Sequence, residues 1–194
     1  MEFKVKHIIY AAGGSVIAYG LYRSFKKKLS NLDYLIAAMQ LGCKASAIKA
    51  VAMIESNGEG FTSTGIVKTR LESQFLAKYQ AASGKAPKSF LTFASAYAYD
   101  ASSAILSTSF GEFQVMGFNY KAAGYTTPQA YYNAVKNSAV SQLNSFVGFV
   151  KVNKLAQYLK DQNWAGFAYR YNGPGYKANS YDTKLAYWYN KFQN

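Results

Sequence analysis

The sequence is poor in the side chains that most often act as metal ligands and nucleophiles. Its 194 residues include one cysteine, Cys43, and one histidine, His7. A disulfide framework and a zinc site of the CxxC type are therefore excluded. Catalytic arrangements that depend on histidine are excluded too, because His7 lies alone near the N-terminus. The sequence also lacks the glycine-rich GxxxxGKS/T and GxGxxG loops that bind nucleotide phosphates.

Acidic residues are scarce as well. Nine Asp and Glu stand against 22 Lys and Arg, which gives a formal net charge of +13. This excess favours a polyanionic partner, such as an anionic cell envelope, anionic lipid or nucleic acid. An enzyme with so few other reactive groups is expected to work with its carboxyls. Hydrophobic residues make up 50% of the chain, which argues against disorder.

Residues 1–29 differ from the rest of the chain. The run from Ile8 to Tyr22 has no charged residue, and basic residues lie on both sides of it. A signal peptide, a membrane anchor and a buried domain helix are all compatible with such a run. The double basic flanks, and the lack of an A-x-A cleavage site before the next lysine cluster, favour an apolar helix that anchors the protein to a membrane. As a helix the run measures roughly 22 Å, which is shorter than the about 30 Å hydrocarbon core.

The chain from Asn31 onward shows mostly helical spacing. Leu32, Leu35, Ile36 and Met39 recur at intervals of three and four residues, after Asn31 or Asp33 as a cap. Ser46 is expected to cap a second helix that ends at Asn57. Further helices are predicted at 71–82, 93–106, 127–135, 139–150, 154–160 and 180–192, and a small hairpin at 61–68. We therefore predict one mainly α domain over residues 30–194.

Two carboxyls occupy positions that suit acid–base chemistry. Glu55 continues the apolar stripe of its predicted helix, where loss of water raises the pKa of a carboxyl. Glu72 shares a helical face with Phe75 and Leu76 in the same way. Glycoside hydrolysis uses such a pair. Both residues are equally open to a plain structural role, Glu55 facing solvent in the last helical turn and Glu72 pairing with Arg70 or Lys68 at the surface.

Two further segments carry groups that recognise sugars. Residues 107–117 combine hydroxyls, a glycine and an amide, and residues 169–176 combine aromatic rings with an amide. Such groups stack on and orient carbohydrates. The first segment is equally compatible with tight helix packing, and the aromatic rings also suit single-stranded nucleic acid.

Four motifs in this order resemble the N-acetylmuramidase domain of phage endolysins, which is related to goose-type lysozymes and lytic transglycosylases. They are I-E-S-x-G-x-G-F at 54–61, L-E-x-x-F at 71–75, S-x-S-F-G-x-F-Q-V-M-G-F-N at 107–119 and Y-N-G-P-x-Y-x-x-N-x-Y-D at 171–182. The resemblance implies a lysozyme-like α fold that cleaves the β-1,4 bond between N-acetylmuramic acid and N-acetylglucosamine. It extends from about residue 41 to residue 192.

The resemblance also assigns roles to individual residues. Glu55 matches the catalytic acid, Glu72 the second carboxylate, and Tyr171 an active-site tyrosine that holds the substrate or the carboxyls. The positions that line the glycan cleft match Ser109, Gly111, Gln114 and Asn172. Ser73 and Gln74 replace the usual Arg-His pair, and Glu112 stands where the family has an apolar residue.

We therefore expect a cationic muramidase, encoded by a phage, that acts on peptidoglycan glycan strands. It is expected to need no metal or organic cofactor and to bind no specific nucleic acid. Residues 8–22 are expected to place it at a host inner membrane, facing the periplasm, or at a virion membrane. A lytic transglycosylase that forms 1,6-anhydro products and a non-catalytic peptidoglycan-binding virion protein remain as alternatives.

Overall fold

A computed structural model describes residues 25–193. The predicted N-terminal apolar helix at 8–22 lies outside these residues. The described chain is mainly α-helical, as predicted, and carries one small antiparallel sheet. Within residues 25–193 no single helix is long and apolar enough to cross a membrane. The pair α3 (Asn31–Leu41) and α4 (Ala45–Ser56) passes by length and composition only when the two are taken together, and they are bent by 112°.

The main core surrounds α4. Ala47, Ile48, Ala50, Val51 and Ala52 are fully buried, so this helix is covered on most of its circumference. It packs against α3 and against α12 (Tyr181–Lys191) from the end of the chain, and α11 (Trp164–Asn172) packs on α12. The helices α9 (Ala139–Val152) and α10 (Ala156–Lys160) close the same core. The late helices therefore fix α4 in place, and the end of α4 carries Glu55.

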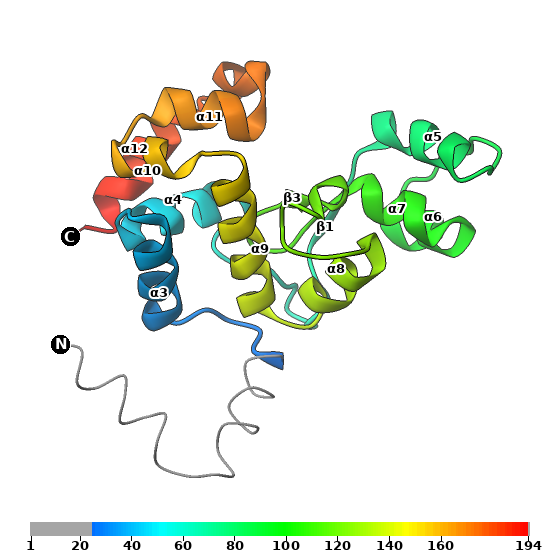
Figure 1. The fold of residues 1–194 in the computed structure, drawn as a ribbon, viewed down its shortest axis with the longest axis horizontal. Coiled ribbons are helices and arrows are strands. Elements are labelled where there is room, and N and C mark those ends of the chain that lie inside the picture. The colour runs from blue at the N-terminus through cyan, green and yellow to red at the C-terminus, as the bar shows by residue number, and fades with distance from the viewer. Residues whose placement is uncertain (1–24, 194) are drawn as a thin grey trace, which may run out of the picture.

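A second group of helices lies on the other side of α9 (Figure 1). It comprises α5 (Ser73–Ala82), α6 (Phe93–Tyr99), α7 (Ala101–Leu106) and α8 (Pro128–Val135). Two smaller cores stabilise it, one around Ile105, Phe110 and Tyr131 and one around Leu76 and Ala104. The predicted single helix at 93–106 is broken at Asp100, where the backbone is extended. The side chain of Asp100 then caps α7 by accepting a hydrogen bond from the amide of Ser103 at 3.1 Å.

The sheet lies between the two groups of helices (Figure 1). Its strands are β1 (Thr69–Leu71), β2 (Thr108–Phe110) and β3 (Val115–Met116), in the order β1-β2-β3 and all antiparallel. The predicted hairpin at 61–68 is only a single bridge between Phe61 and Val67. The hairpin that forms is β2–β3, because Gly111 adopts a φ of +73° and Gln114 one of +47° in the connecting turn.

Several helix ends differ from the sequence-based prediction. Ser30, rather than Asn31 or Asp33, caps α3 through a capping box with Asp33. The second helix begins after Lys44, and Ser46 is buried inside it. The predicted helix at 71–82 begins at Ser73, which leaves Glu72 at the N-cap.

Two elements had no helical prediction: α11 and the short η2 (Pro174–Asn179), which follows the expected break at Gly173. Another short turn, η1 (Gly117–Asn119), follows β3.

The buried face of α3 is not the face whose apolar spacing predicted the helix. The helix buries Asp33, Tyr34, Ala37, Ala38 and Leu41. Leu32, Leu35 and Met39, which gave the helical spacing, lie on its outer face and are 50%, 52% and 83% exposed.

Candidate active site

Glu55 lies in the last turn of α4, at the edge of the main core. The helix ends directly after it, because Asn57 adopts a left-handed conformation with a φ of +59° and its amide donates back into the helix. Lys68 Nζ donates to the carbonyl oxygen of Ser56 at 2.9 Å and so gives a hydrogen-bond partner to one of the free carbonyls at the helix end. From the sequence, Glu55 either continues the apolar stripe of its helix or faces solvent; in the structure its side chain is half-buried.

The carboxyl of Glu55 is held by a tyrosine from the end of the chain. The hydroxyl of Tyr181, in α12, donates a hydrogen bond to Glu55 Oε1. Burial raises the pKa of Glu55 to about 7, even though the Tyr181 hydrogen bond and the charge of Arg70 act to lower it. A carboxyl with this pKa is largely protonated in mildly acidic solution and can act as a general acid.

Glu72 is held from two sides at the end of β1. Arg70 Nε lies 2.9 Å from one of its carboxylate oxygens, and Gln74 Nε2 donates to the other at 3.0 Å. The side chain of Glu72 is 16% exposed, whereas that of Arg70 is 75% exposed. Glu72 thus pairs with Arg70, one of the two surface partners considered from the sequence, and still lines a cleft. Gln74, at a position where the resemblance shows a departure, orients this carboxylate.

A cleft of about 580 Å³ brings the two carboxyls together. Its walls come from the start of α5, the sheet, and the C-terminal ends of α9 and α11. Besides Glu55 and Glu72, its lining includes Arg70, Gln74, Ser109, Gln114, Phe118, Asn119, Arg170, Tyr171 and Asn172.

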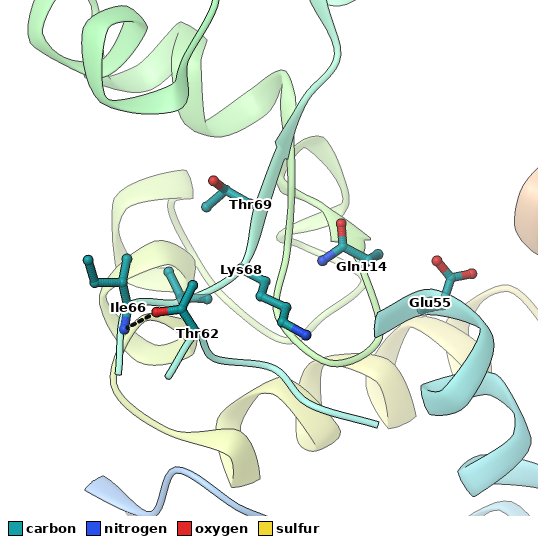
Figure 2. A pocket seen from close by; sticks show the side chains of 7 residues that line it. Glu55, Thr62, Ile66, Lys68, Thr69 and Gln114 are labelled. Atoms are coloured by element: carbon teal, nitrogen blue, oxygen red, sulfur yellow. Dashed lines mark hydrogen bonds between the residues drawn. The ribbon is translucent and has the colours of Figure 1, made fainter. Parts of the chain in front are cut away.

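A second depression of about 440 Å³ is lined by Glu55 and by residues within 62–69, the segment that leads into β1. Figure 2 shows Glu55 and Gln114 at one end of it and Thr62, Ile66 and Thr69 at the other. The side chain of Lys68 lies between the two ends in this view. Glu55 and Gln114 line both depressions, so the two adjoin at these side chains, and we call the two together the groove.

Ser109 and Gln114 form a fixed polar pair in the floor of the cleft. Ser109 Oγ donates to Gln114 Oε1 at 2.7 Å, and Gln114 Nε2 donates to the carbonyl of Gly111 at 2.7 Å. These bonds hold the amide of Gln114 in one orientation. Asn172, at the end of α11, contributes an exposed amide to the opposite wall.

Tyr171 lines the cleft, as the resemblance implies, whereas Gly111 does not. The phenol of Tyr171 donates to the carbonyl of Phe113 at 2.6 Å, and its ring stacks on Phe167. The expected contact between a phenol and a catalytic carboxyl is made by Tyr181 instead. Gly111 is buried and is not among the residues that line the cleft; a Cβ there would lie 2.3 Å from the side chain of Gln142. Its role is to let the β2–β3 turn pack on α9.

Sequence reasoning did not assign Tyr181 or Arg170 to the site, and it considered Arg70 only as a surface partner of Glu72. Tyr181 lies in the late Y-N-G-P run, so the motif contained the signal, but spacing gives no reason to join it to Glu55. Tyr181 is 4% exposed, and such a buried phenol needs a hydrogen-bond partner. The two arginines are ordinary in the sequence and gain meaning only from their place in the cleft.

Glu112 lies on the other side of the β2–β3 turn. It is 2% exposed and accepts a hydrogen bond from the hydroxyl of Tyr34, while Ser56 Oγ donates to its carbonyl at 2.8 Å. Burial raises the pKa of Glu112 to about 7. It is not among the residues that line the groove at Glu55, so we assign it a structural role. Among residues 25–193 no group of three His, Cys, Asp or Glu side chains is arranged as metal ligands.

Comparison with known proteins identifies the family. The N-acetylmuramidase family matches residues 77–193. The crystal structure of Burkholderia AP3 phage endolysin is similar over 86% of this chain and 71% of that chain, with a TM-score of 0.75 and 32% sequence identity. No match was found among curated proteins. The fold is therefore lysozyme-like, and this chain belongs to the N-acetylmuramidase family of glycoside hydrolases that act on peptidoglycan.

Proposed function

We propose that the protein hydrolyses the β-1,4 bond between N-acetylmuramic acid and N-acetylglucosamine, with Glu55 as the general acid. One observation carries the proposal. The carboxyl of Glu55 lies where the two halves of the groove meet, and its pKa is raised to about 7. A glycan strand laid along the groove would pass this carboxyl.

The chemistry follows from how Glu55 is held. Tyr181 occupies Oε1, so the other carboxyl oxygen is the one that presents the proton to the glycosidic oxygen. As that proton moves, the bond from the anomeric carbon to the leaving oxygen breaks, and positive charge develops on the sugar. Glu72, paired with Arg70, stabilises this charge or orients the attacking water. The water then supplies the new oxygen on the anomeric carbon, and its proton passes to a carboxylate.

The rest of the groove suits the substrate. Ser109, Gln114 and Asn172 provide hydroxyl and amide groups for sugar hydroxyls and N-acetyl groups. Tyr171 shapes the wall between them. Arg70, Arg170 and Lys68 give the groove a cationic lining that fits the carboxylates of muropeptides.

We also propose that the enzyme is encoded by a phage and is held at a membrane through residues 8–22. The similarity to a phage endolysin supports the first statement. The second rests on the uncharged run and its basic flanks. Such a tether would place the enzyme at the host inner membrane or at a virion membrane.

Mass spectrometry of digested peptidoglycan tests the reaction. Purified sacculi are digested in water enriched in heavy oxygen, and the muropeptides are separated. Hydrolysis gives reducing muropeptides that carry the heavy oxygen, whereas a lytic transglycosylase gives 1,6-anhydro products without it. A protein that only binds peptidoglycan releases neither, which would refute the proposal.

The role of Glu55 is tested in the same assay. Glu55→Gln is expected to lower turnover by about 10²–10⁴-fold, because general acid catalysis is lost. Glu59→Gln is the matched control, since Glu59 is an exposed carboxyl four residues away and does not line the groove. Equal activity of the Glu55 and Glu59 variants would remove Glu55 from the mechanism.

A further inference from the structure

The outer face of α3 is an apolar stripe that the described part of the chain leaves uncovered. Leu32, Leu35 and Met39 lie at positions i, i+3 and i+7, and each is at least half exposed. Phe25, just before this helix, is 63% exposed. A soluble helix normally turns such a stripe toward the core. In α3 the core-facing side is instead made of alanines, Tyr34, Leu41 and Asp33.

Positive charge surrounds this stripe. From Phe25 to Ile54 the chain carries five lysines and a single acidic residue, Asp33. Asp33 is buried and forms an ion pair with Lys26 at 2.5 Å, so it offers little negative charge to the surface. Lysines also lie at both ends of α3, where Lys49 Nζ donates to Asn31 at 2.9 Å and Lys151 Nζ to Gln40 at 3.4 Å.

The position of α3 in the chain points in the same direction. It begins at Asn31, nine residues after Tyr22, the end of the uncharged run. Lys26 is fixed to the domain, because its carbonyl accepts from the amide of Ala139 at 2.7 Å and its side chain pairs with Asp33 in the first turn of α3. The run at 8–22 is therefore joined, four residues before Lys26, to a point of the domain close to the start of α3. In Figure 1, α3 lies well away from α5, so a surface that contacts the stripe does not cover the α5 wall of the cleft.

We propose that the outer face of α3, with its flanking lysines, binds the surface of an anionic lipid bilayer. An interfacial helix of this kind buries an apolar stripe among the acyl chains and places cations among the headgroups. Two weak membrane contacts in one chain give stable attachment where one does not. The run at 8–22 is shorter than the hydrocarbon core, and α3 supplies the second contact. This inference builds on the proposed tether and is independent of the catalytic mechanism.

Charge favours a lipid bilayer over two other partners that could cover the stripe, a second copy of the protein and the run at 8–22 of the same chain. A second copy of this face would bring the same lysines together, and like charges repel. The run at 8–22 is itself flanked by Lys6, Arg23 and Lys26–Lys28, so folding it onto α3 would also concentrate positive charge. An anionic lipid surface neutralises these charges and accepts the apolar side chains at the same time.

A fluorescent probe on α3 tests the inference in the full chain. Leu35→Cys in a Cys43→Ser background is labelled with a polarity-sensitive dye and mixed with phosphatidylglycerol vesicles. The dye is expected to shift to shorter wavelength and to be quenched by lipids that carry a quencher on the acyl chain. The matched control is the dye at Leu91→Cys, since Leu91 is fully exposed on the segment before α6. That dye is expected not to respond.

Co-sedimentation of the unlabelled full chain with the same vesicles separates the stripe from the tether. Leu35→Gln/Met39→Gln is expected to weaken binding by about tenfold or more, because two apolar side chains no longer enter the lipid. Leu91→Gln is expected to bind as the parent does. Binding by the full chain with no response from the dye at position 35 would leave the tether standing and refute the role of α3.

The other occupants give distinct outcomes, and each would overturn the inference. A dye already in an apolar environment without vesicles, at every protein concentration, would show that residues 8–22 cover the stripe. An apolar signal that grows with protein concentration would indicate a second copy. Equal binding to phosphatidylcholine and phosphatidylglycerol vesicles would remove the role of the lysines.

Discussion

The hydroxyl of Tyr181 and the carboxyl of Glu55 are joined by a hydrogen bond across 126 residues of sequence. The bond links the end of α4 to the start of α12, two helices that pack together in the main core. It fixes one oxygen of the proposed acid, and it opposes the effect of burial on the pKa of Glu55. The tyrosine is therefore a positioning residue for the carboxyl.

Tyr181→Phe is expected to shift the pH profile upward. The hydrogen bond lowers the pKa of Glu55, so its loss raises that pKa and the acid stays protonated to higher pH. The alkaline limb of kcat should move to higher pH while kcat itself falls several-fold, because the carboxyl is less well oriented. Tyr187→Phe, an exposed tyrosine on the same helix, is the control. An unmoved alkaline limb in Tyr181→Phe would contradict this role.

Glu72 is expected to be needed for hydrolysis. Glu72→Gln removes the negative charge that faces the developing cation, and kcat should fall by about 10²-fold or more with little change in stability. Gln74→Glu removes the amide donor and places a second carboxylate beside Glu72, so repulsion between like charges should displace Glu72 and lower kcat too. Steady-state kinetics on peptidoglycan check both. Full activity in Glu72→Gln would favour the transglycosylase alternative.

Stability is expected to fall as the pH rises from about 4.5 to about 7. Burial raises the pKa of Glu55 and of Glu112 from the ordinary 4.5 to about 7. Between these two pH values the folded protein holds protons that the unfolded chain has released. The contribution of the two protonated carboxyls to the free energy of unfolding is therefore complete below about pH 4.5 and is lost as the pH rises to about 7. Each group contributes a slope of at most about 1.4 kcal/mol per pH unit.

Glu112→Gln isolates one of these two groups. Its amide oxygen still accepts from Tyr34, and it does not titrate. Urea unfolding at pH 5 and pH 8 should show a smaller loss of stability than in the parent, whereas Asp161→Asn should match the parent, because Asp161 is exposed and is not among the charges that act on Glu112. If the stability of Glu112→Gln depended on pH as strongly as that of the parent, the carboxyl of Glu112 would not be a source of the pH dependence.

Removal of residues 1–24 is expected to leave an active enzyme that binds vesicles weakly and in a salt-sensitive manner. All proposed catalytic residues lie after Cys43. Removal of residues 1–29 should instead lower stability by about 1–3 kcal/mol, because the bond from Ala139 to Lys26 and the Lys26–Asp33 ion pair are lost. Thermal unfolding and sedimentation with membranes measure both effects. Unfolding caused by the shorter deletion would show that residues 1–24 belong to the domain.

The sequence alone determined the class of the fold and the first members of the site. Local signals were sufficient for most helices, because capping residues and apolar spacing act within a few residues of each other. The four ordered motifs indicated the family, and Glu55 could be placed at a core boundary from its own helix. The apolar spacing of α3 predicted a helix correctly and its buried face incorrectly, since spacing does not say which of two apolar faces finds a partner.

Tertiary structure decided what depends on contacts between distant segments. It brought Tyr181 to Glu55, gave Arg70 and Gln74 to Glu72, and removed Gly111 from the cleft by packing it against Gln142. It also paired β1 with β2 across an intervening run of helices, where local propensity had suggested a hairpin at 61–68. The physical reason is the same in each case. A hydrogen bond or a strand pairing between residues far apart in the chain depends on how the cores close, and no short stretch of sequence contains that information.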